Sequence, residues 1–296
     1  MSSLLQTINH ELITLVESVL LSTVSISGTS DDLSMSSSGS GWVFSEGVIV
    51  TNHHVIDGLV DPIQVQPPGQ RDLVGKLVGS DPDNDIAVLR VNGLSAKPLC
   101  LELEPPKLGE LCLAIGSPLG LRESASLGII SGLSRQSKHP DGAIIEEMLQ
   151  TDASINPGNS GGPLLNIEGK LLGMNTMGPA ETVNLAVSAE TIAAVVPELL
   201  AHGSIMRATI GISVAATQLQ RGNYNKRGIE VRRIRDTANN CLQPGDLLIE
   251  INGYPIKRRI DVIRALGRET VDTEVAVLVE RNGEHLTLQC KARQKS

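Results

Sequence analysis

The 296-residue sequence has few aromatic residues: one Trp, one Phe and two Tyr. The hydrophobic core must therefore be aliphatic, and a surface that stacks aromatic rings on nucleic-acid bases is disfavoured. The formal net charge of −8 likewise disfavours a general DNA-binding or anionic-membrane-binding protein. No Gly-rich loop that ends in Lys-Ser or Lys-Thr occurs, so an ATP-driven motor is not encoded.

Cysteine is scarce as well, and the four cysteines form no CxxC pair and no metal-ligand spacing. Cys112 lies in an apolar run, which favours a buried free thiol. We therefore expect no structural disulfide, no metal and no other cofactor. The N-terminus lacks a basic segment, and its apolar stretch carries Glu11 and Glu17, unlike a signal peptide or a membrane-spanning helix. The expected location is the cytoplasm, or an extracytoplasmic one if a leader has been removed.

The hydrophobic pattern predicts an N-terminal helix and two domains. Apolar residues recur at three- and four-residue spacing over residues 4–21, as in an amphipathic helix. This helix either packs on its own domain or forms a contact between subunits. Short β-type runs then follow at roughly 10-residue spacing, which predicts a barrel or a sandwich. Residues 22–41 are expected to form a strand followed by a mobile loop. The expected strands after them are residues 41–44, 48–51, 63–65, 73–78, 86–91, 111–115, 126–131, 164–167, 170–176 and 183–187.

Helical spacing over residues 189–202 ends at Gly203, which is typical of a helix stop. The β pattern then restarts, and it predicts a second compact domain with one helix at residues 259–266. Asn282-Gly283 predicts a tight hairpin within this domain.

The stretch Asn156-Pro157-Gly158-Asn159-Ser160-Gly161-Gly162-Pro163-Leu164 places one serine among three glycines. Glycine allows backbone angles that other residues avoid. Ser160 can therefore present its hydroxyl beside converging backbone N–H groups, the arrangement that acyl transfer needs.

A base and an orienting acid are available elsewhere in the chain. His53 and His54 are adjacent at the end of the expected strand 48–51, and catalytic groups concentrate in such loops. Asp85 directly precedes an apolar strand and is the carboxylate expected to be drawn inward, while Asp81 and Asp83 are expected to cap or brace the turn.

Three motifs resemble the trypsin-like proteases of the HtrA/Deg family: Thr51-Asn52-His53-His54-Val55, Asp85-Ile86-Ala87-Val88-Leu89 and Gly158-Asn159-Ser160-Gly161-Gly162-Pro163. Residues 114–120 and 149–153 match the same family. The resemblance implies a mainly β chain. A helix over residues 1–21 precedes a chymotrypsin-like double β-barrel over residues 22–203, and a small α/β PDZ domain follows over residues 204–296.

By this resemblance, His54 is the general base, Asp85 orients its imidazole, and Ser160 is the nucleophile. The backbone N–H groups of Gly158 and Ser160 would form the oxyanion hole, with the N–H of Asn159 nearby.

Two departures from digestive trypsin-like enzymes sharpen this expectation. Those enzymes use an aspartate before the serine to pair with a freed N-terminus, and Asn159 makes that switch unavailable. Ser154, followed by Ile155, stands where trypsin has an acid, so the S1 pocket is expected to favour small aliphatic P1 residues such as Val, Ala, Leu or Ile.

The C-terminal region resembles a PDZ domain, with residues 242–253 as its most characteristic run. Ile210, Gly211 and Ile212 lie where the family carries its carboxylate-binding loop, so they are expected to hold a peptide C-terminus. This domain would regulate the protease or tether its substrates.

The expected function is an ATP-independent serine endopeptidase of protein quality control and the stress response, which cleaves unfolded or damaged proteins. The alternative is a chaperone or peptide-binding protein with secondary or no proteolytic activity. A metal-dependent hydrolase that uses His53 and His54 is disfavoured because no third ligand cluster is visible.

The resemblance also implies a homotrimer assembled through N-terminal segments, often with aromatic contacts. Residues 1–40 hold no aromatic residue. Either aliphatic residues such as Leu12, Val16 and Leu20 replace that contact, or the trimer is weak or absent.

Overall fold

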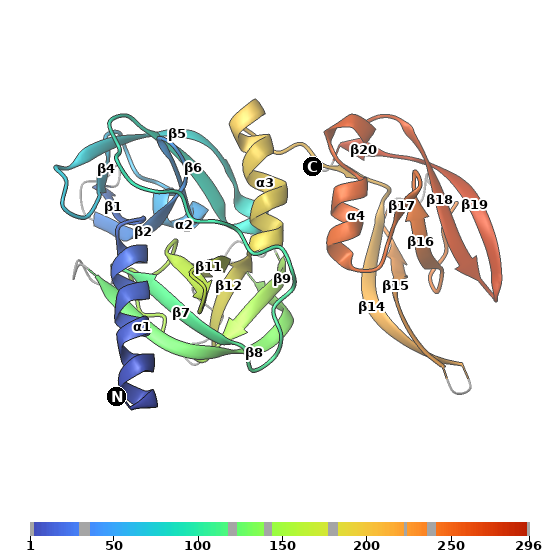
Figure 1. Cartoon of the computed structure of the whole chain (residues 1–296). Coiled ribbons are helices and arrows are strands. Elements are labelled where there is room, and N and C mark those ends of the chain that lie inside the picture. The colour runs from blue at the N-terminus through green and yellow to red at the C-terminus, as the bar shows by residue number, and fades with distance from the viewer. Residues whose placement is uncertain are drawn as a thin grey trace. The chain divides into compact units, whose positions relative to one another are not determined.

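The computed structural model describes residues 3–29, 36–117, 123–138, 144–176, 183–221, 224–235 and 241–294 (Figure 1). The chain divides into two units, Met1–Ser204 and Ile205–Ser296. Strands dominate both units, and the predicted fold class of a double β-barrel followed by a PDZ domain is confirmed.

The first unit contains two closed six-stranded antiparallel barrels. The first barrel has the strand order β1 (Thr23–Thr29), β2 (Ser36–Ser45), β3 (Val48–Thr51), β6 (Ile86–Val91), β5 (Leu73–Asp81) and β4 (Ile63–Gln66). The second has the order β10 (Pro163–Asn166), β11 (Leu171–Thr176), β12 (Asn184–Ser188), β9 (Ile144–Thr151), β8 (Ser124–Lys138) and β7 (Leu111–Gly116). Closure leaves neither barrel with an open edge strand.

Aliphatic side chains fill the two barrels, as the scarcity of aromatic residues requires. Val24, Ile26 and Leu89 belong to the core of the first barrel, and Ile130 and Leu164 belong to the core of the second. At about 25 cal/mol for each Å² of buried apolar surface, this burial is the main force that holds the site in place.

Strand β9 is the one barrel strand that the sequence did not predict. Its residues Ile145, Met148 and Leu149 are buried, so apolar positions do not alternate with polar ones. Register shifts interrupt the β8–β9 pairing, and Glu147 has a positive φ of 55°. Such bulges break the two-residue period on which strand prediction depends.

Helix α3 (Ala189–His202) has the predicted bounds. The hydroxyl of Ser188 accepts a hydrogen bond from the N–H of Thr191 at its start, and Gly203 ends it in the left-handed region with φ 71°. It packs against β5 and β6 of the first barrel and against β11 of the second. Figure 1 shows it beside both barrels.

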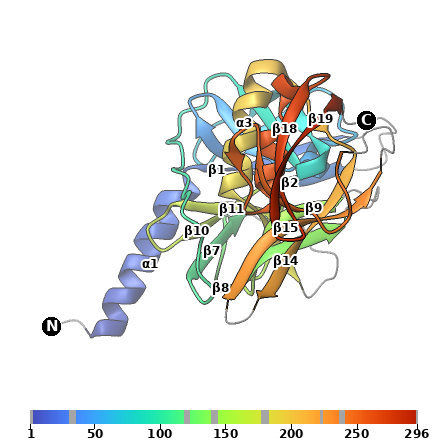
Figure 2. The same ribbon diagram turned by 90° about the vertical axis from the view of Figure 1, so that its right-hand side faces the viewer.

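Helix α1 (Leu4–Leu20) is the predicted N-terminal helix. It begins with a capping box between Ser3 and Gln6, and Val19 is its one buried residue. Figure 2 shows α1 projecting from the barrels. An apolar groove of about 300 Å³ lies between α1 and the second barrel, lined by Leu12, Ile13, Val16, Glu17, Leu113, Ala125 and Leu127. None of the helices in the described ranges is long and apolar enough to cross a membrane.

The second unit is a sheet covered by one helix. The sheet order is β14 (Ile212–Arg221), β15 (Tyr224–Ile234), β16 (Leu247–Ile251), β18 (Glu274–Arg281) and β19 (Glu284–Lys291), and β17 (Tyr254–Pro255) pairs with β16. A separate two-stranded sheet joins β13 (Ala208–Thr209) to β20 (Arg293–Gln294). Helix α4 (Arg259–Ala265) lies close to β14.

The Asn282-Gly283 turn has the predicted geometry. It joins β18 to β19, and both residues have positive φ angles, 53° and 91°. This is the turn whose twist matches that of the flanking strands.

The expectation of no structural disulfide was wrong. Cys241 and Cys290 are joined, with Cα atoms 6.1 Å apart. They lie 49 residues apart in the sequence, and the folded sheet brings Cys290 of β19 to the turn that contains Cys241. The spacing of the cysteines in the sequence does not predict such a pair. Cys112 is buried with a free thiol, as expected.

Candidate active site

His54 lies in a short helix, α2 (His53–Ile56), immediately after β3. Its ring Nδ1 is 2.8 Å from Oδ2 and 3.0 Å from Oδ1 of Asp85, and its backbone N–H donates to Oδ1 at 3.0 Å. Asn52 adds a third link, because its side-chain amide donates to the Asp85 carbonyl at 2.9 Å. A carboxylate only accepts hydrogen bonds, so the proton of a neutral imidazole is held on Nδ1 and Nε2 is left as the base.

Asp85 is held inward by an unusual backbone conformation. It follows the 3₁₀ helix η1 (Pro82–Asn84) and has a left-handed φ of 54°, which is uncommon for a residue other than glycine. Its side chain is about 1% exposed, and the hydroxyl of Thr176 donates to Oδ2 at 2.8 Å. Asp81 accepts a hydrogen bond from the amide of Asn84 at 2.7 Å, which braces this turn.

The glycine-rich turn that contains Ser160 lies just before β10. A Cβ atom on Gly161 would overlap the carbonyl oxygen of Ser40 and the hydroxyl of Thr51, so only glycine fits there. The N–H of Asn159 is used within the turn, where it donates to the Asn156 carbonyl at 2.9 Å. Among the hydrogen bonds formed by the described residues, none uses the N–H of Gly158 or Ser160. These two donors are available to a ligand.

The predicted base and the predicted nucleophile come from different barrels. His54 follows a strand of the first barrel, and Ser160 precedes a strand of the second. No hydrogen bond joins the two side chains within the described part of the chain. Such contacts are often long in ligand-free enzymes and shorten when substrate binds.

His53 does not share this site. Its ring Nε2 is 4.0 Å from the carboxylate of Asp57, one turn along the chain. No group of three potential metal ligands exists among the residues that the structure describes.

Two polar residues of the site were not predicted from the sequence. Thr176, at the end of β11, binds Asp85 from 91 positions away. Ser40, in β2, is fully buried; its N–H donates to the Ser160 carbonyl at 2.8 Å, and its hydroxyl donates to the Gly158 carbonyl at 2.7 Å. The same hydroxyl accepts from the N–H of Ser117 at 2.8 Å. The one sequence signal for Ser40 is its position between two glycines.

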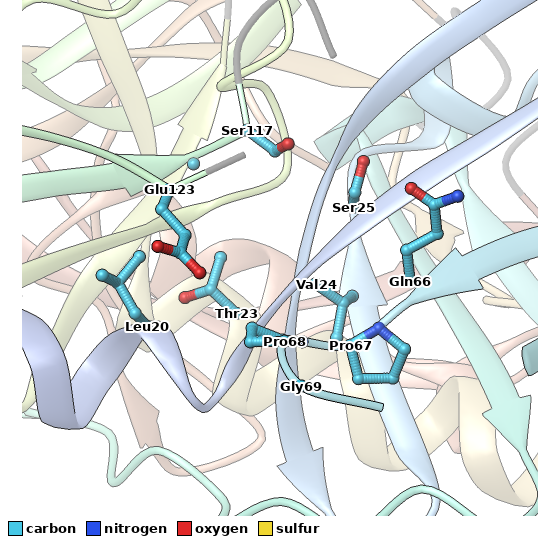
Figure 3. Close-up of a pocket in the computed structure, with 11 residues that line it drawn as sticks. Leu20, Thr23, Val24, Ser25, Gln66, Pro67, Pro68, Gly69, Ser117 and Glu123 are labelled. Carbon is cyan, nitrogen blue, oxygen red and sulfur yellow. The ribbon is translucent and has the colours of Figure 1, made fainter. Parts of the chain in front are cut away.

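A small cavity lies beside Ser117, between the two barrels. Its volume is about 50 Å³, enough for one or two water molecules and too small for a peptide. Figure 3 shows Ser117 and Glu123 on the side of the second barrel, and Ser25 and Gln66 on the side of the first. The cavity therefore adds no substrate site.

The two residues predicted for the S1 pocket have different surroundings. Ser154 is exposed, and its carbonyl accepts a hydrogen bond from the Ser126 hydroxyl at 2.8 Å. Ile155 is half-buried and packs against the core of the second barrel.

The predicted carboxylate-binding loop of the second unit precedes β14. Ile210 is buried, Gly211 has a positive φ of 70°, and Ile212 begins the strand. The N–H of Gly211 donates to the hydroxyl of Thr209 at 3.1 Å. A bound carboxylate would have to replace that hydroxyl to use this N–H.

Known proteins share both units. Residues 39–174 match the family model "Trypsin-like peptidase domain", and residues 208–292 match "PDZ domain". The chain is 36% identical over 273 residues to "Protease Do-like 1, chloroplastic" of Arabidopsis thaliana, covering 84% of this chain and 61% of that protein. It is 31% identical over 300 residues to "Serine protease Do-like HtrA" of Bacillus subtilis (strain 168), covering 92% and 67%.

A solved structure extends this likeness to three dimensions. "HtrA-type protease AlgW with tripeptide" matches with a TM-score of 0.78 at 28% identity, over 96% of this chain and 97% of that chain. Bacterial relatives at 32–34% identity are named periplasmic serine endoproteases, and the chain spans little more than half of their length. By these comparisons, the chain belongs to the HtrA/Deg family of trypsin-like serine proteases that carry a PDZ domain.

Proposed function

We propose that this chain is an ATP-independent serine endopeptidase of protein quality control. The observation that carries the proposal is the pairing of the His54 imidazole with the buried carboxylate of Asp85, on the barrel opposite the glycine-rich turn of Ser160. The family relationship supports the same activity.

The reaction begins when Ser160 Oγ attacks the scissile carbonyl and His54 Nε2 accepts its proton. The Asp85 carboxylate stabilises the resulting imidazolium through Nδ1, and Thr176 and the backbone N–H of His54 keep that carboxylate in position. The N–H groups of Gly158 and Ser160 bind the oxyanion. His54 then protonates the leaving amine, and water releases the acyl group by the same steps.

The S1 pocket supports a preference for small aliphatic residues. Neither Ser154 nor Ile155 carries a charge that could pair with Lys or Arg at P1. The half-buried position of Ile155 offers an apolar surface instead.

The second unit binds peptide C-termini, and by doing so it regulates the protease or tethers its substrates. An extended peptide would add a strand to the edge of β14, with its carboxylate at Ile210, Gly211 and Ile212. This binding would bring unfolded or misfolded polypeptides to the protease.

The protein works as a homo-oligomer, as the family suggests. Leu4 and Leu5 of α1 are 76% and 77% exposed, and an apolar groove runs beside this helix. A second copy would cover these side chains through aliphatic rather than aromatic contacts.

An extracytoplasmic location fits the chain better than the cytoplasm. Relatives are named periplasmic or chloroplastic. The Cys241–Cys290 disulfide also favours an oxidising compartment, since cytosolic thiols are kept reduced.

The proposed activity is tested on a permanently unfolded protein. Purified chain should degrade reduced casein in a buffer without nucleotide, should leave a stably folded protein intact, and should lose this activity in Ser160→Ala. If casein survives while the protein suppresses the aggregation of an unfolded client, the chaperone alternative takes its place.

A further inference from the structure

The two units of the chain carry opposite charge. Residues 205–296 hold 16 Lys and Arg against 10 Asp and Glu, a formal net charge of +6. The other 204 residues hold nine Lys and Arg against 23 Asp and Glu, a formal net charge of −14. The overall charge of −8 therefore conceals a cationic peptide-binding unit.

Strand β14 offers the edge to which a peptide could be added. It is the terminal strand of its sheet and pairs with β15 alone among the described strands. Ile212 and Val214 pack against the core of the unit, so both point to the same side of the sheet as helix α4. Ser213 lies between them and points to the opposite side, because successive strand side chains alternate.

Two arginines, Arg233 of β15 and Arg235 just after this strand, lie close to Ser213 on the side away from the free edge of β14. Ser213 pairs with Arg233 of β15, and both are on the face that is turned away from the core. Arg233 is exposed and takes no part in the ion pairs between described residues, whereas its neighbour Arg232 pairs with Glu230 at 3.3 Å. Arg235 is also exposed, and its N–H donates to the carbonyl of Gly211 in the carboxylate-binding loop.

An added peptide strand would place alternate side chains over these cations. If the terminal side chain enters the apolar side with Ile212, the penultimate residue and the one two places before it lie on the Ser213 side. The added strand is about two strand spacings, roughly 10 Å, from Arg233. Because the Ser213 side chain is short, the Arg233 side chain can extend over it toward the peptide. A glutamate of the peptide can extend toward Arg233, so that the two charged groups meet.

We propose that the second unit selects C-terminal peptides with Asp or Glu at the penultimate position or two residues before it, through Arg233 and Arg235 beside Ser213. This rests on the proposed capture of peptide C-termini by the same unit. Exposed ion pairs are weak and screened by salt, so each acidic residue should strengthen binding about two- to fivefold at low ionic strength.

The test uses the full chain with Ser160→Ala, so that peptides are not cut. Fluorescence anisotropy measures Kd for labelled decapeptides that end in Val and differ only by Glu, Gln or Lys at the penultimate position. A fourth peptide carries Glu and a C-terminal amide. The Glu peptide should bind most tightly and the Lys peptide most weakly, and high salt should bring the three values together.

Charge reversal at Arg233 is the second arm. Arg233→Glu should reverse the order of the Glu and Lys peptides, and the matched control Arg232→Gln should keep it, since Arg232 is already ion-paired. Binding of all three free-acid peptides with equal Kd, while the amide fails to bind, would overturn the acidic preference and leave C-terminal capture intact. Equal binding of the amide and free-acid Glu peptides would overturn both, because the C-terminal carboxylate would then take no part in recognition.

Discussion

The Ser40 hydroxyl offers a sharp test of how the glycine-rich turn of Ser160, which carries the proposed oxyanion donors Gly158 and Ser160, is positioned. It donates to the Gly158 carbonyl at 2.7 Å and accepts from the N–H of Ser117 at 2.8 Å, and Ser40 is fully buried. Ser40→Ala removes the hydroxyl that both of these groups contact. An orphaned buried polar group costs about 1–3 kcal/mol, so the lost bond to the Gly158 carbonyl alone would cost about that much if nothing moved.

The turn has a less costly alternative. Gly158 is half-buried and Pro157 is exposed, so the Gly158 carbonyl can rotate toward water. That rotation turns the peptide plane that also carries the Asn159 N–H, so it breaks the bond from this N–H to the Asn156 carbonyl and distorts the turn that holds the N–H groups of Gly158 and Ser160. The loss of one oxyanion donor typically costs about 10²–10³ in kcat. We therefore expect Ser40→Ala to lower kcat by about 10²–10³ with little change in KM. The melting midpoint should fall by only about 2–4 °C for each kcal/mol that remains unrelieved.

Steady-state hydrolysis of a short peptide substrate measures kcat and KM, and calorimetry measures the midpoint. Ser38→Ala is the matched control, because it removes an exposed hydroxyl from the same strand two residues earlier. A lower melting midpoint with wild-type kcat would show that the hydrogen bonds of the Ser40 hydroxyl stabilise the fold without positioning the oxyanion donors. An equal loss of kcat in Ser38→Ala would show that the effect is not specific to the Ser40 hydroxyl.

The other predictions concern the substrate pocket, α1 and the cysteines. Among peptides that differ only at P1, Val, Ala, Leu or Ile should give the highest kcat/KM, and a superior Arg or Lys peptide would contradict the roles given to Ser154 and Ile155. Deletion of residues 1–20 should reduce the number of subunits in the oligomer, as measured from the molar mass by light scattering. An unchanged number of subunits would exclude α1 from assembly. Iodoacetamide should alkylate exposed Cys100 and spare Cys112, because burial raises the pKa of the Cys112 thiol. Peptide mapping by mass spectrometry checks this, and modified Cys112 in folded protein would contradict it.

The sequence predicted the parts of the molecule that depend on local patterns. Gly203 ends α3 and Asn282-Gly283 forms its hairpin, because both depend on backbone angles that neighbouring residues determine. His54, Asp85 and Ser160 were predicted as catalytic residues from motifs whose residue types suit that chemistry.

Long-range pairings were not predictable in this way. The Ser40 hydroxyl meets the Gly158 carbonyl across 118 positions, and Thr176 meets Asp85 across 91. Serine and threonine are common polar residues, so nothing local distinguishes these two until the barrels close. The Arg233–Ser213 pairing likewise depends on sheet register, which a bulge after Ser213 shifts by one residue.

The central claim is that Ser160 is an activated nucleophile, and covalent labelling tests it most directly. Intact protein treated with a fluorophosphonate should gain one adduct, peptide mapping should place that adduct on Ser160, and His54→Ala should slow labelling by orders of magnitude. No adduct on folded, oligomeric protein, or an adduct on another serine that persists in Ser160→Ala, would contradict the account.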